Sequence, residues 1–544
     1  MAMLGTALAA MLVAPAGAMT RDALGAYVSA RAADASGDPA TAARLLANLV
    51  RTMPAEPLLR RRAIGHAIEA GEMEIALQLG GRVPADQAAL DLRLLLVADE
   101  LRRGNEARAI QLLRTPGGII DSSFLAPFVE AWMLAGKRDP KALDVLAMVP
   151  DSSPLAGQRD EQRARILLRL KRPAEALPFA ALALRSAGGR ADRLRLALAD
   201  GFRAAGDRAN ALKMLDGEGL TLAEARARLT AGKPLGQAVD NAPKAFAELL
   251  LGLTLALNKL QDKSLPTSLA QIALYANPDN PAGTLLLALL LDAGNRDGDA
   301  LALLRTVQPG QPFAAQAQDA EVRILTGMGR RDEALVRARA FAAATPNADA
   351  YSRLGATLIA HEAFSEAADA YARALALSAT GPASDDAWAL HLFRASALES
   401  ANRWAESKQE MAAAMTLSPD NPLLLNFLGY GQLERGENLD EAEAMVRKAS
   451  ALRPDDASIT DSLGWAQYKR GRTDEAIATL QRAAEGDPAQ AEIHEHLGDA
   501  LYTAGRRIEA RFAWRAALVT AEDKMKKRLD AKLAFGLTPA NASP

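Results

Sequence analysis

The stretch SLGWAQYKRGRTDEAIATLQRAAEGDP, residues 462–488, decides the fold of this chain. Its residue types suit one helical hairpin: small residues where two helices cross closely, larger apolar residues along the seam, and a proline that stops the second helix. The positions that carry this pattern are Leu463, Gly464, Ala476, Leu480, Ala483 and Pro488. The stretch therefore predicts two helices joined by a short turn and packed on each other.

The same phrase recurs at a nearly fixed interval. Its central glycines are Gly429, Gly464 and Gly498, which are 35 and 34 residues apart. An interval of about 34 residues holds one helix-turn-helix unit of a stacked repeat protein. In the third copy the pattern falls on His494, Leu497, Gly498, Leu501, Ala510, Trp514 and Ala517, with Gly505 at the turn. Three consecutive copies predict a solenoid.

This pattern resembles the tetratricopeptide repeat, whose signature reads Trp-x2-Leu-Gly-x2-Tyr, then Ala-x3-Phe, then Pro. Two departures are visible, because Gln467 and Leu501 occupy the tyrosine position and the unit around Gly429 has one extra residue near Asn438. The resemblance implies an all-α fold: a right-handed superhelical solenoid of stacked helix-turn-helix repeats.

Weaker copies of the unit extend toward the N-terminus. One of them contains Gly355, Ala367, Tyr371 and Ala374 at the template positions. Further back, polar turns between Ala/Leu-rich segments contain Gly37, Gly71, Gly104, Gly136, Gly206 and Gly294. At about 34 residues a unit, the chain has room for roughly 13 to 15 hairpins and little else.

The repeats divide into an N-terminal degenerate block, residues 19–216, and a C-terminal block, residues 244–520. Between them the regularity lapses at residues 217–243, where glycine and proline at Gly232 and Pro234 are expected to end a helix. This irregular unit is either a hinge between two blocks or a divergent hairpin, and we favour the hairpin.

The C-terminal end predicts a cap. A solenoid needs its last apolar face covered, and residues 521–536 place Met525, Leu529 and Leu533 on one stripe of a helix. We expect this helix to cap the last repeat and residues 537–544 to form a flexible tail.

The N-terminus predicts export. An apolar run at residues 3–13 is followed by Ala16-Gly17-Ala18, an A-x-A pattern suited to signal-peptide cleavage, so residues 1–18 are interpreted as a signal peptide. The run is too short to span a bilayer. No lysine or arginine precedes it, unlike in a typical signal peptide, so the alternative to a periplasmic protein is a cytoplasmic one with an apolar first helix.

Composition and motifs argue against nucleic-acid binding and catalysis. The formal net charge is −2, with 64 basic and 66 acidic residues, whereas nucleic-acid binders usually carry a basic excess. No metal-ligand spacing connects the five histidines, there is no cysteine, and no phosphate-binding glycine loop or nucleophile elbow is present. We therefore expect no enzyme, no cofactor and no metal.

The resemblance also implies a binding groove lined by the first helix of each hairpin. In the tetratricopeptide family the groove-facing positions lie five, nine and twelve places into each repeat. Counted from the three glycines, the candidate groove residues are Asn426, Tyr430, Asp461, Trp465, Tyr468, Glu495, Asp499 and Tyr502. For Trp465, packing between adjacent repeats is an equal alternative. Because the acidic members would repel a carboxylate, we expect neutral or basic peptide segments as ligands, bound with or without a free C-terminus.

The predicted function is a protein-protein interaction scaffold or adaptor. Residues from about Trp388 to Leu518 resemble the C-terminal repeats of bacterial envelope tetratricopeptide proteins, which implies an adaptor or assembly role in the cell envelope. The partner would be a protein or peptide, and the sequence leaves the oligomeric state open. Two alternatives remain, an enzyme-regulatory subunit and a self-assembling structural protein.

Overall fold

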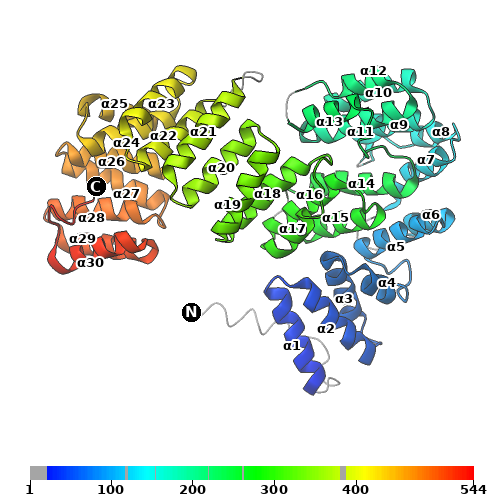
Figure 1. Cartoon of the computed structure of the whole chain (residues 1–544). Helices are drawn as coiled ribbons and strands as arrows, with labels where there is room; N and C mark the ends of the chain where they lie inside the picture. The colour runs from blue at the N-terminus through cyan, green and yellow to red at the C-terminus, as the bar shows by residue number, and fades with distance from the viewer. Residues whose placement is uncertain are drawn as a thin grey trace. The chain divides into compact units, whose positions relative to one another are not determined.

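The computed structural model describes residues 21–116, 121–153, 155–217, 220–259, 262–379 and 387–543. In these residues the chain forms 30 α-helices, three short 3-10 helices and no strand. Most helices pack against the helix that follows them, so the repeating object is an antiparallel helical hairpin (Figure 1). The predicted all-α solenoid of stacked helix-turn-helix repeats is confirmed.

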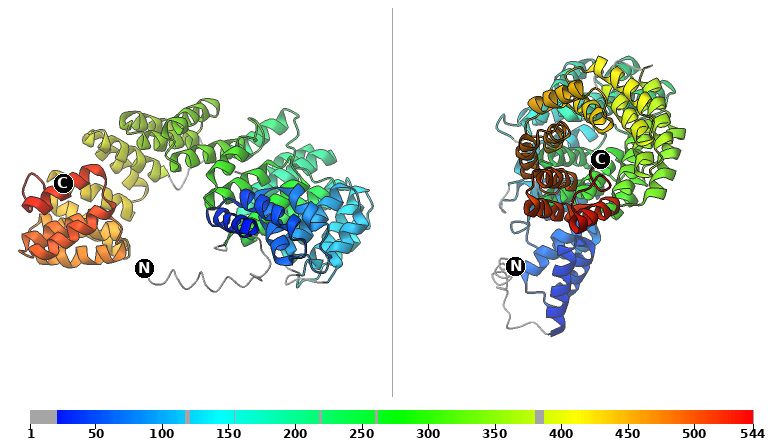
Figure 2. Two further views of the ribbon diagram at one scale, coloured as in Figure 1. Left: turned by 90° about the horizontal axis from the view of Figure 1, so that it is seen from below. Right: turned by 90° about the vertical axis from the view of Figure 1, so that its left-hand side faces the viewer.

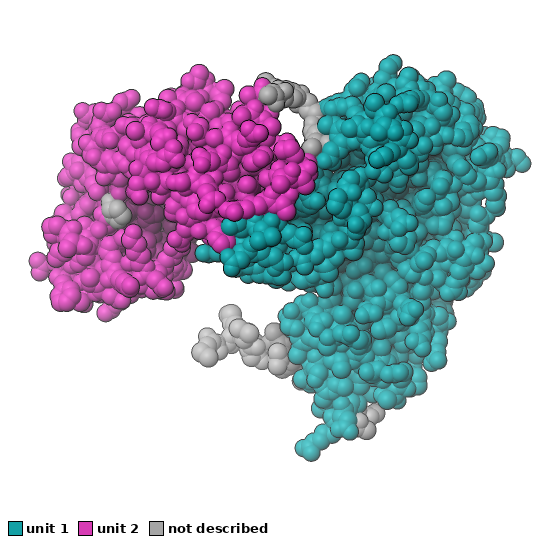
Figure 3. Space-filling model, viewed as in Figure 1, with its two compact units in different colours: residues 1–337 teal, residues 338–544 magenta. Residues whose placement is uncertain are grey.

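The molecule divides into two compact units, residues 1–337 and residues 338–544 (Figure 3). The helices of unit 1 are α1 (Arg21–Ala35), α2 (Pro39–Thr52), α3 (Pro57–Ala70), α4 (Met73–Gly80), α5 (Leu90–Arg102), α6 (Glu106–Arg114), α7 (Ala126–Gly136), α8 (Ala142–Ala147), α9 (Arg159–Arg169), α10 (Pro173–Arg185), α11 (Ala191–Ala205), α12 (Arg208–Met214), α13 (Leu220–Thr230), α14 (Ala242–Leu257), α15 (Ser264–Ala276), α16 (Pro281–Ala293), α17 (Asp297–Leu304) and α18 (Ala314–Gly327).

Along the chain, α19 (Arg331–Ala344) contains the boundary between the units. The helices of unit 2 are α20 (Ala348–Ala360), α21 (Phe364–Ser378), α22 (Ala387–Ser400), α23 (Trp404–Leu417), α24 (Pro422–Arg435), α25 (Leu439–Leu452), α26 (Ala457–Lys469), α27 (Thr473–Gly486), α28 (Ala491–Thr503), α29 (Arg507–Thr520) and α30 (Asp523–Phe535). Both views of Figure 2 follow these hairpins as they stack in chain order.

The repeated glycines mark the points where the two helices of a hairpin cross. A Cβ added at Gly464 would lie 2.6 Å from Leu480 Cγ, and one added at Gly429 would lie 2.8 Å from Val446 Cγ2. At Gly498 the added atom would collide with the indole of Trp514. The period found in the sequence is therefore the period of close helix crossings, which a larger side chain would force apart.

The extra residue near Asn438 is accommodated locally. The first helix α24 ends at Arg435, one residue further past its signature glycine than α26 does, and Asn438 then adopts a left-handed conformation with φ +45°. Asparagine tolerates this conformation better than most residues, so the hairpin keeps its register.

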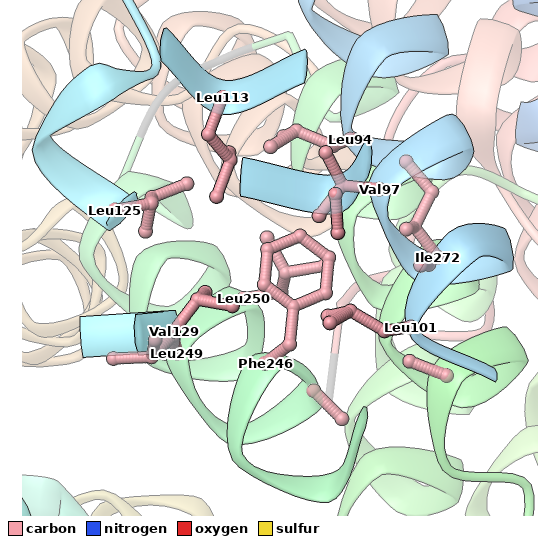
Figure 4. Packing of buried hydrophobic residues seen from close by; sticks show 14 of the residues in the cluster. Leu94, Val97, Leu101, Leu113, Leu125, Val129, Phe246, Leu249, Leu250 and Ile272 are labelled. Carbon is pink, nitrogen blue, oxygen red and sulfur yellow. The ribbon is translucent and has the colours of Figure 1, made fainter. Parts of the chain in front are cut away.

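Unit 1 returns on itself, which a simple stack of repeats does not do. The helices α14 and α15 pack against α3, α5 and α7, which precede them by more than a hundred residues. The Phe246 ring of α14 is fully buried at this junction, among Leu94 and Val97 of α5, Val129 of α7 and Ile272 of α15 (Figure 4). Sequence periodicity did not indicate this closure.

Polar contacts hold the same junction. The hydroxyl of Tyr275 on α15 donates to Asp99 Oδ1 on α5 at 2.8 Å. The backbone carbonyl of Glu69, at the end of α3, accepts from Gln271 Nε2 at 3.3 Å and from Arg296 Nη1 at 3.0 Å. These bonds join residues 176 to 227 positions apart in the chain.

The irregular segment at residues 217–243 contains α13 and then runs without a helix from Gly232 to Asn241. One buried carboxylate organises that stretch: Asp200 accepts backbone N–H bonds from Leu235 at 3.2 Å, Gln237 at 2.8 Å and Ala238 at 3.0 Å. Because these amides are satisfied by a side chain, the chain can turn here without secondary structure before it enters α14. The division into compact units falls about a hundred residues later.

Near the C-terminus, Leu529 of α30 is fully buried against the last hairpin, with Met525 and Leu533 packed at the same cluster. The described residues that follow, expected to form a flexible tail, make buried contacts. Asn541 and Ser543 are 7% and 5% exposed, and the backbone N–H of Ser543 donates to Asp499 Oδ2 at 2.9 Å. A buried acceptor therefore holds this segment in place.

Along the described part of the chain, no helix combines the length and the apolar character that crossing a membrane requires. The predicted signal peptide, residues 1–18, lies outside the described residues.

Candidate functional site

The eight candidate groove residues all lie on α24, α26 and α28, the first helices of three consecutive hairpins. Asn426 and Tyr430 belong to α24, and Asp461, Trp465 and Tyr468 to α26. The remaining three, Glu495, Asp499 and Tyr502, belong to α28. Since α26 contacts both α24 and α28, the repeat template placed these residues on neighbouring helices.

Trp465 packs between repeats and does not face a groove. Its side chain is 1% exposed, and its indole N–H donates to Glu434 Oε1 on α24 at 2.7 Å. Its ring stacks on Tyr468 with centroids 4.9 Å apart and on His496 of α28 at 4.1 Å. Of the two interpretations considered for this residue, inter-repeat packing describes the structure.

Asp461 pairs with a histidine from the next repeat. His496 Nδ1 lies 3.0 Å from Asp461 Oδ2, and both residues are almost fully buried. Burial alone would lower the pKa of His496, but the adjacent Asp461 carboxylate outweighs burial and raises that pKa. The carboxylate expected to meet a partner is therefore neutralised inside the protein.

Glu495 and Asp499 are also neutralised, by the terminal helix. Both have 0% exposure, and Lys532 Nζ of α30 lies 2.7 Å from Glu495 Oε1 and 2.8 Å from Asp499 Oδ2. Arg528 adds a two-pronged contact to Glu495, with Nε at 2.7 Å from Oε1. The expectation that Asp461, Glu495 and Asp499 form an accessible acidic strip is thus wrong, because long basic side chains of α30 and a histidine reach them first.

Four of the eight residues remain partly accessible: Asn426, Tyr430, Tyr468 and Tyr502. The Tyr430 hydroxyl is 3.4 Å from Glu492 Oε1, and burial together with nearby Glu434 raises the Tyr430 pKa. The Tyr468 hydroxyl is 2.9 Å from Thr503 Oγ1. Asn426 has a buried side-chain oxygen, Oδ1, with no hydrogen-bond partner in the described structure.

Polar side chains form what we call the inter-repeat ladder, in which each rung joins the first helix of one repeat to that of the next. The last two rungs are buried, whereas the first is partly exposed and the second has one half-exposed member. The four rungs are Glu399–Arg435 at 2.9 Å, Glu434–Trp465 at 2.7 Å, Asp461–His496 at 3.0 Å and Glu495–Lys532 at 2.7 Å. Each rung spans between 31 and 37 residues, close to one repeat.

Sequence reasoning missed Glu434, His496 and Lys532 as partners of the groove positions. A signal was present, because each lies about one repeat from a residue of complementary chemistry. A template of groove positions does not use this spacing. It predicts which side of a helix a residue lies on, but not which side chains of the next repeat are long enough to contact that residue.

One rung of the ladder combines a carboxylate with a histidine. The Asp461–His496 pair has the geometry of an acid that orients a base, but His496 Nε2 is buried and has no hydrogen-bond partner in the described structure, so no nucleophile stands beside it. Among the described residues no cluster of three metal-ligating side chains is found.

A separate pocket of about 810 Å³ opens in unit 1 where α15 packs near α3 and α5. Apolar residues and charges of both signs line it, including Arg61, Glu69 and Asp91. Burial raises the pKa of both carboxyl groups. Gly65 lines this pocket and has space for a side chain, since an added Cβ would contact only Asp91 Oδ2, at 3.8 Å.

Comparison with known proteins gives one match to a family model and several solved structures of low sequence identity. Residues 464–505 match the model of the TPR repeat. The chain is similar to a chain in the crystal structure of the APC/C hetero-tetramer Cut9–Hcn1, with 15% identity, 94% of this chain and 95% of that chain covered, and a TM-score of 0.39. It is also similar to PilF of Pseudomonas aeruginosa, with 21% identity, 34% of this chain and 82% of that chain covered, and a TM-score of 0.29.

A third similar structure is a tetratricopeptide repeat protein from Parabacteroides merdae, with 14% identity, 54% of this chain and 99% of that chain covered, and a TM-score of 0.33. No curated protein matches the sequence.

The stacked helical hairpins, several of them with a glycine at the close crossing, define a helical repeat scaffold. Residues 464–505, which match the model of the TPR repeat, show that the repeat in this part of the chain is of the tetratricopeptide kind.

Proposed function

We propose that the protein is an interaction scaffold or adaptor that binds a partner protein or peptide across the first helices of unit 2. The observation that carries the proposal is the arrangement on α24, α26 and α28. The inter-repeat ladder fixes these helices, and three half-buried tyrosines and the half-buried Asn426 lie on the same helices. Rigid aromatic side chains on a preorganised surface bind with little loss of entropy.

The partner segment is neutral or basic and internal to its chain. Asp461, Glu495 and Asp499 contribute no net charge to the surface, because each is paired, but Glu434 and Glu492 remain half-exposed beside Tyr430. These two carboxylates disfavour a terminal carboxylate and favour a basic side chain. Amidating the partner's C-terminus should leave affinity unchanged.

The proposed location is the cell envelope, which rests on the apolar run and the A-x-A site in residues 1–18. N-terminal sequencing of the protein recovered from the periplasmic fraction tests it. A terminus beginning at Met19 supports export, and an intact Met1 on protein from the cytosol contradicts it.

The test of binding is an affinity pull-down from envelope extract with tagged protein beginning at Met19. The diagnostic variant combines Asn426→Ala with Tyr468→Ala, which truncates the accessible surface and leaves all four ladder rungs intact. Its matched control is Tyr351→Ala on α20, which removes another half-buried tyrosine from unit 2. We expect wild type and control to retain one specific partner and the double variant to lose it.

A third variant separates the two candidate surfaces. Gly65→Leu fills the unit 1 pocket without a backbone clash. Loss of the partner in Gly65→Leu alone would move the binding site to unit 1. If wild type retains nothing, the scaffold proposal fails, and light scattering at rising concentration then tests self-assembly.

A further inference from the structure

The outward face of α29 exposes large apolar side chains that nothing in the described structure covers. Ile508 is 75% exposed, Phe512 64% and Val519 81%. At 100° per residue these three positions lie within about 40° of one another around the helix axis. They therefore form one apolar stripe, which we call the α29 stripe.

Two arginines border the stripe without counter-charges. Arg511 and Arg515 are exposed and lie on the same side of the helix. Neither has a hydrogen bond or an ion pair with any described residue, whereas Arg506, just before the helix, is held by Glu509. The face of α29 thus presents exposed apolar groups and free positive charge together.

The corresponding helices of the two preceding repeats lack this face. The positions equivalent to Ile508, Phe512 and Val519 are Asp474, Ala478 and Glu485 in α27 and Asp440, Ala444 and Ala451 in α25. All six are exposed. Since the repeat architecture accepts polar or small residues there, the apolar stripe of α29 is not a requirement of the fold.

The last helix adds to the same chemistry. On α30, Phe535 is 81% exposed, and the side chains of Lys524 and Lys527 on the same helix are also exposed. From Arg506 to Gly536 the chain has nine basic and four acidic residues, in a protein whose net charge is −2. Two of the nine, Arg528 and Lys532, pair with the buried Glu495 and Asp499, which leaves seven others. Positive charge is therefore concentrated at this end of unit 2.

We propose that the α29 stripe and its arginines dock on an anionic lipid surface. Helices that lie in a membrane interface combine an apolar stripe with basic residues beside it, and anionic headgroups complement the positive charge. A second copy of the chain is a poorer fit, because a symmetric contact through this face would bring Arg511 and Arg515 of both copies together. A stripe of three protruding side chains also suits a lipid surface better than a folded partner, which needs about 800 Å² of matched surface.

This surface lies on the second helix of the last repeat and is independent of the partner-binding surface proposed on α24, α26 and α28. The two proposals can therefore fail separately. A protein that docked at the membrane through α29 would still present the first helices of its repeats to a partner.

The test is flotation of the full chain with vesicles of phosphatidylcholine alone or of phosphatidylcholine mixed with phosphatidylglycerol. One variant combines Ile508→Ser with Phe512→Ser, and a second combines Arg511→Glu with Arg515→Glu. The control combines Arg373→Glu with Arg482→Glu, which makes the same charge change at exposed arginines of unit 2 away from α29. All substituted side chains are exposed, and circular dichroism verifies that each variant is folded.

We expect wild type and control to bind the mixed vesicles, and each α29 variant to bind at least roughly tenfold more weakly. High salt should weaken the binding of wild type. Equal binding by all four proteins overturns the proposal, and so does a wild type that binds neither vesicle, in which case an acidic protein surface becomes the occupant to test. Because every variant retains residues 1–18, binding through the N-terminal apolar run would appear as equal binding.

Discussion

The two units use the same helical hairpin in different ways. In unit 1 the chain returns, so that Tyr275 bonds to Asp99 across 176 residues and Phe246 fills a core made by helices from both halves of the unit. In unit 2 the ladder rungs join residues 31 to 37 positions apart, and each repeat is tied to its neighbours. Local contacts give a stack whose stability is approximately a sum over repeats, whereas a closed unit is expected to unfold cooperatively.

The buried charges of the two units reflect this difference. In unit 1, Glu248 accepts from Arg193 at 2.8 Å, Arg165 at 3.1 Å and Asn280 at 2.9 Å, and so joins three segments at one point. In unit 2 the buried carboxylates are distributed one or two to a repeat interface. The comparison predicts which perturbations spread and which stay local.

The largest effect is expected from Phe246→Ala. Its ring has no exposure and contacts helices on both sides of the unit 1 closure, so the substitution leaves a cavity and should cost about 4–5 kcal/mol of unfolding free energy. Hydrogen exchange should show loss of protection in α5, α7 and α14 together, with α24 to α28 unchanged. Loss confined to α14 would contradict the description of unit 1 as one cooperative body.

A smaller and local effect is expected from Lys532→Met. The substitution leaves the buried Glu495 and Asp499 carboxylates without their shared cation, at a cost of about 3–4 kcal/mol. Arg528 still pairs with Glu495, which limits the loss. Exchange should rise in α28 to α30 and nowhere in unit 1, and the exposed Lys527→Met is the matched control.

Acid should weaken unit 1 through Glu248. Burial alone would raise the pKa of this carboxyl group, but Arg193 and Arg165 outweigh burial and lower it to about 2. The contribution is therefore fully present above the ordinary value of 4.5 and is lost as pH falls from 4.5 toward 2, by about 3 kcal/mol. In Glu248→Gln the unfolding free energy should fall less steeply between pH 4.5 and pH 2 than in wild type. The same steepness in both proteins would show that Glu248 is not the cause of the fall.

Mild alkali should weaken unit 2 through His496, the smallest effect of the four. Its pKa is raised by Asp461, so its contribution is complete below 6.5 and is lost as pH rises through the folded-state value. Thermal unfolding measured above pH 6.5 should show the decline in wild type and not in His496→Gln. The half-exposed His494→Gln should behave as wild type; a decline that persists in His496→Gln would assign it to another group.

Sequence predicted the hairpins because their cause is local. The spacing of Gly464 from Leu480 is set by one helix crossing, and the same spacing returns wherever that crossing is repeated. The closure of unit 1 had no such signature, because Phe246 meets α5 through a return of the chain and no fixed interval separates the contacting residues.

The candidate site was predicted at the level of helices and only partly at the level of side chains. All eight residues do lie on adjacent first helices. However, Trp465 stacks on His496 and donates to Glu434. Asp499 is already bound by Lys532, Trp514 and Ser543. The face of the helix on which a residue lies follows from periodicity. Whether a neighbouring side chain already hydrogen-bonds to that residue depends on the length and rotamer of the neighbour. Binding by the four accessible residues stays a proposal.

The rungs of the inter-repeat ladder are chemically unlike one another: guanidinium with carboxylate, indole with carboxylate, imidazole with carboxylate, and ammonium with carboxylate. Near-identical repeats risk stacking out of order while the chain folds, since any one could dock on any other. At the two buried rungs, Asp461–His496 and Glu495–Lys532, a skipped or exchanged repeat would leave a buried carboxylate facing a partner of the wrong shape, at the cost of an unsatisfied polar group. We infer that the unlike partners at these rungs favour one order in which the repeats stack.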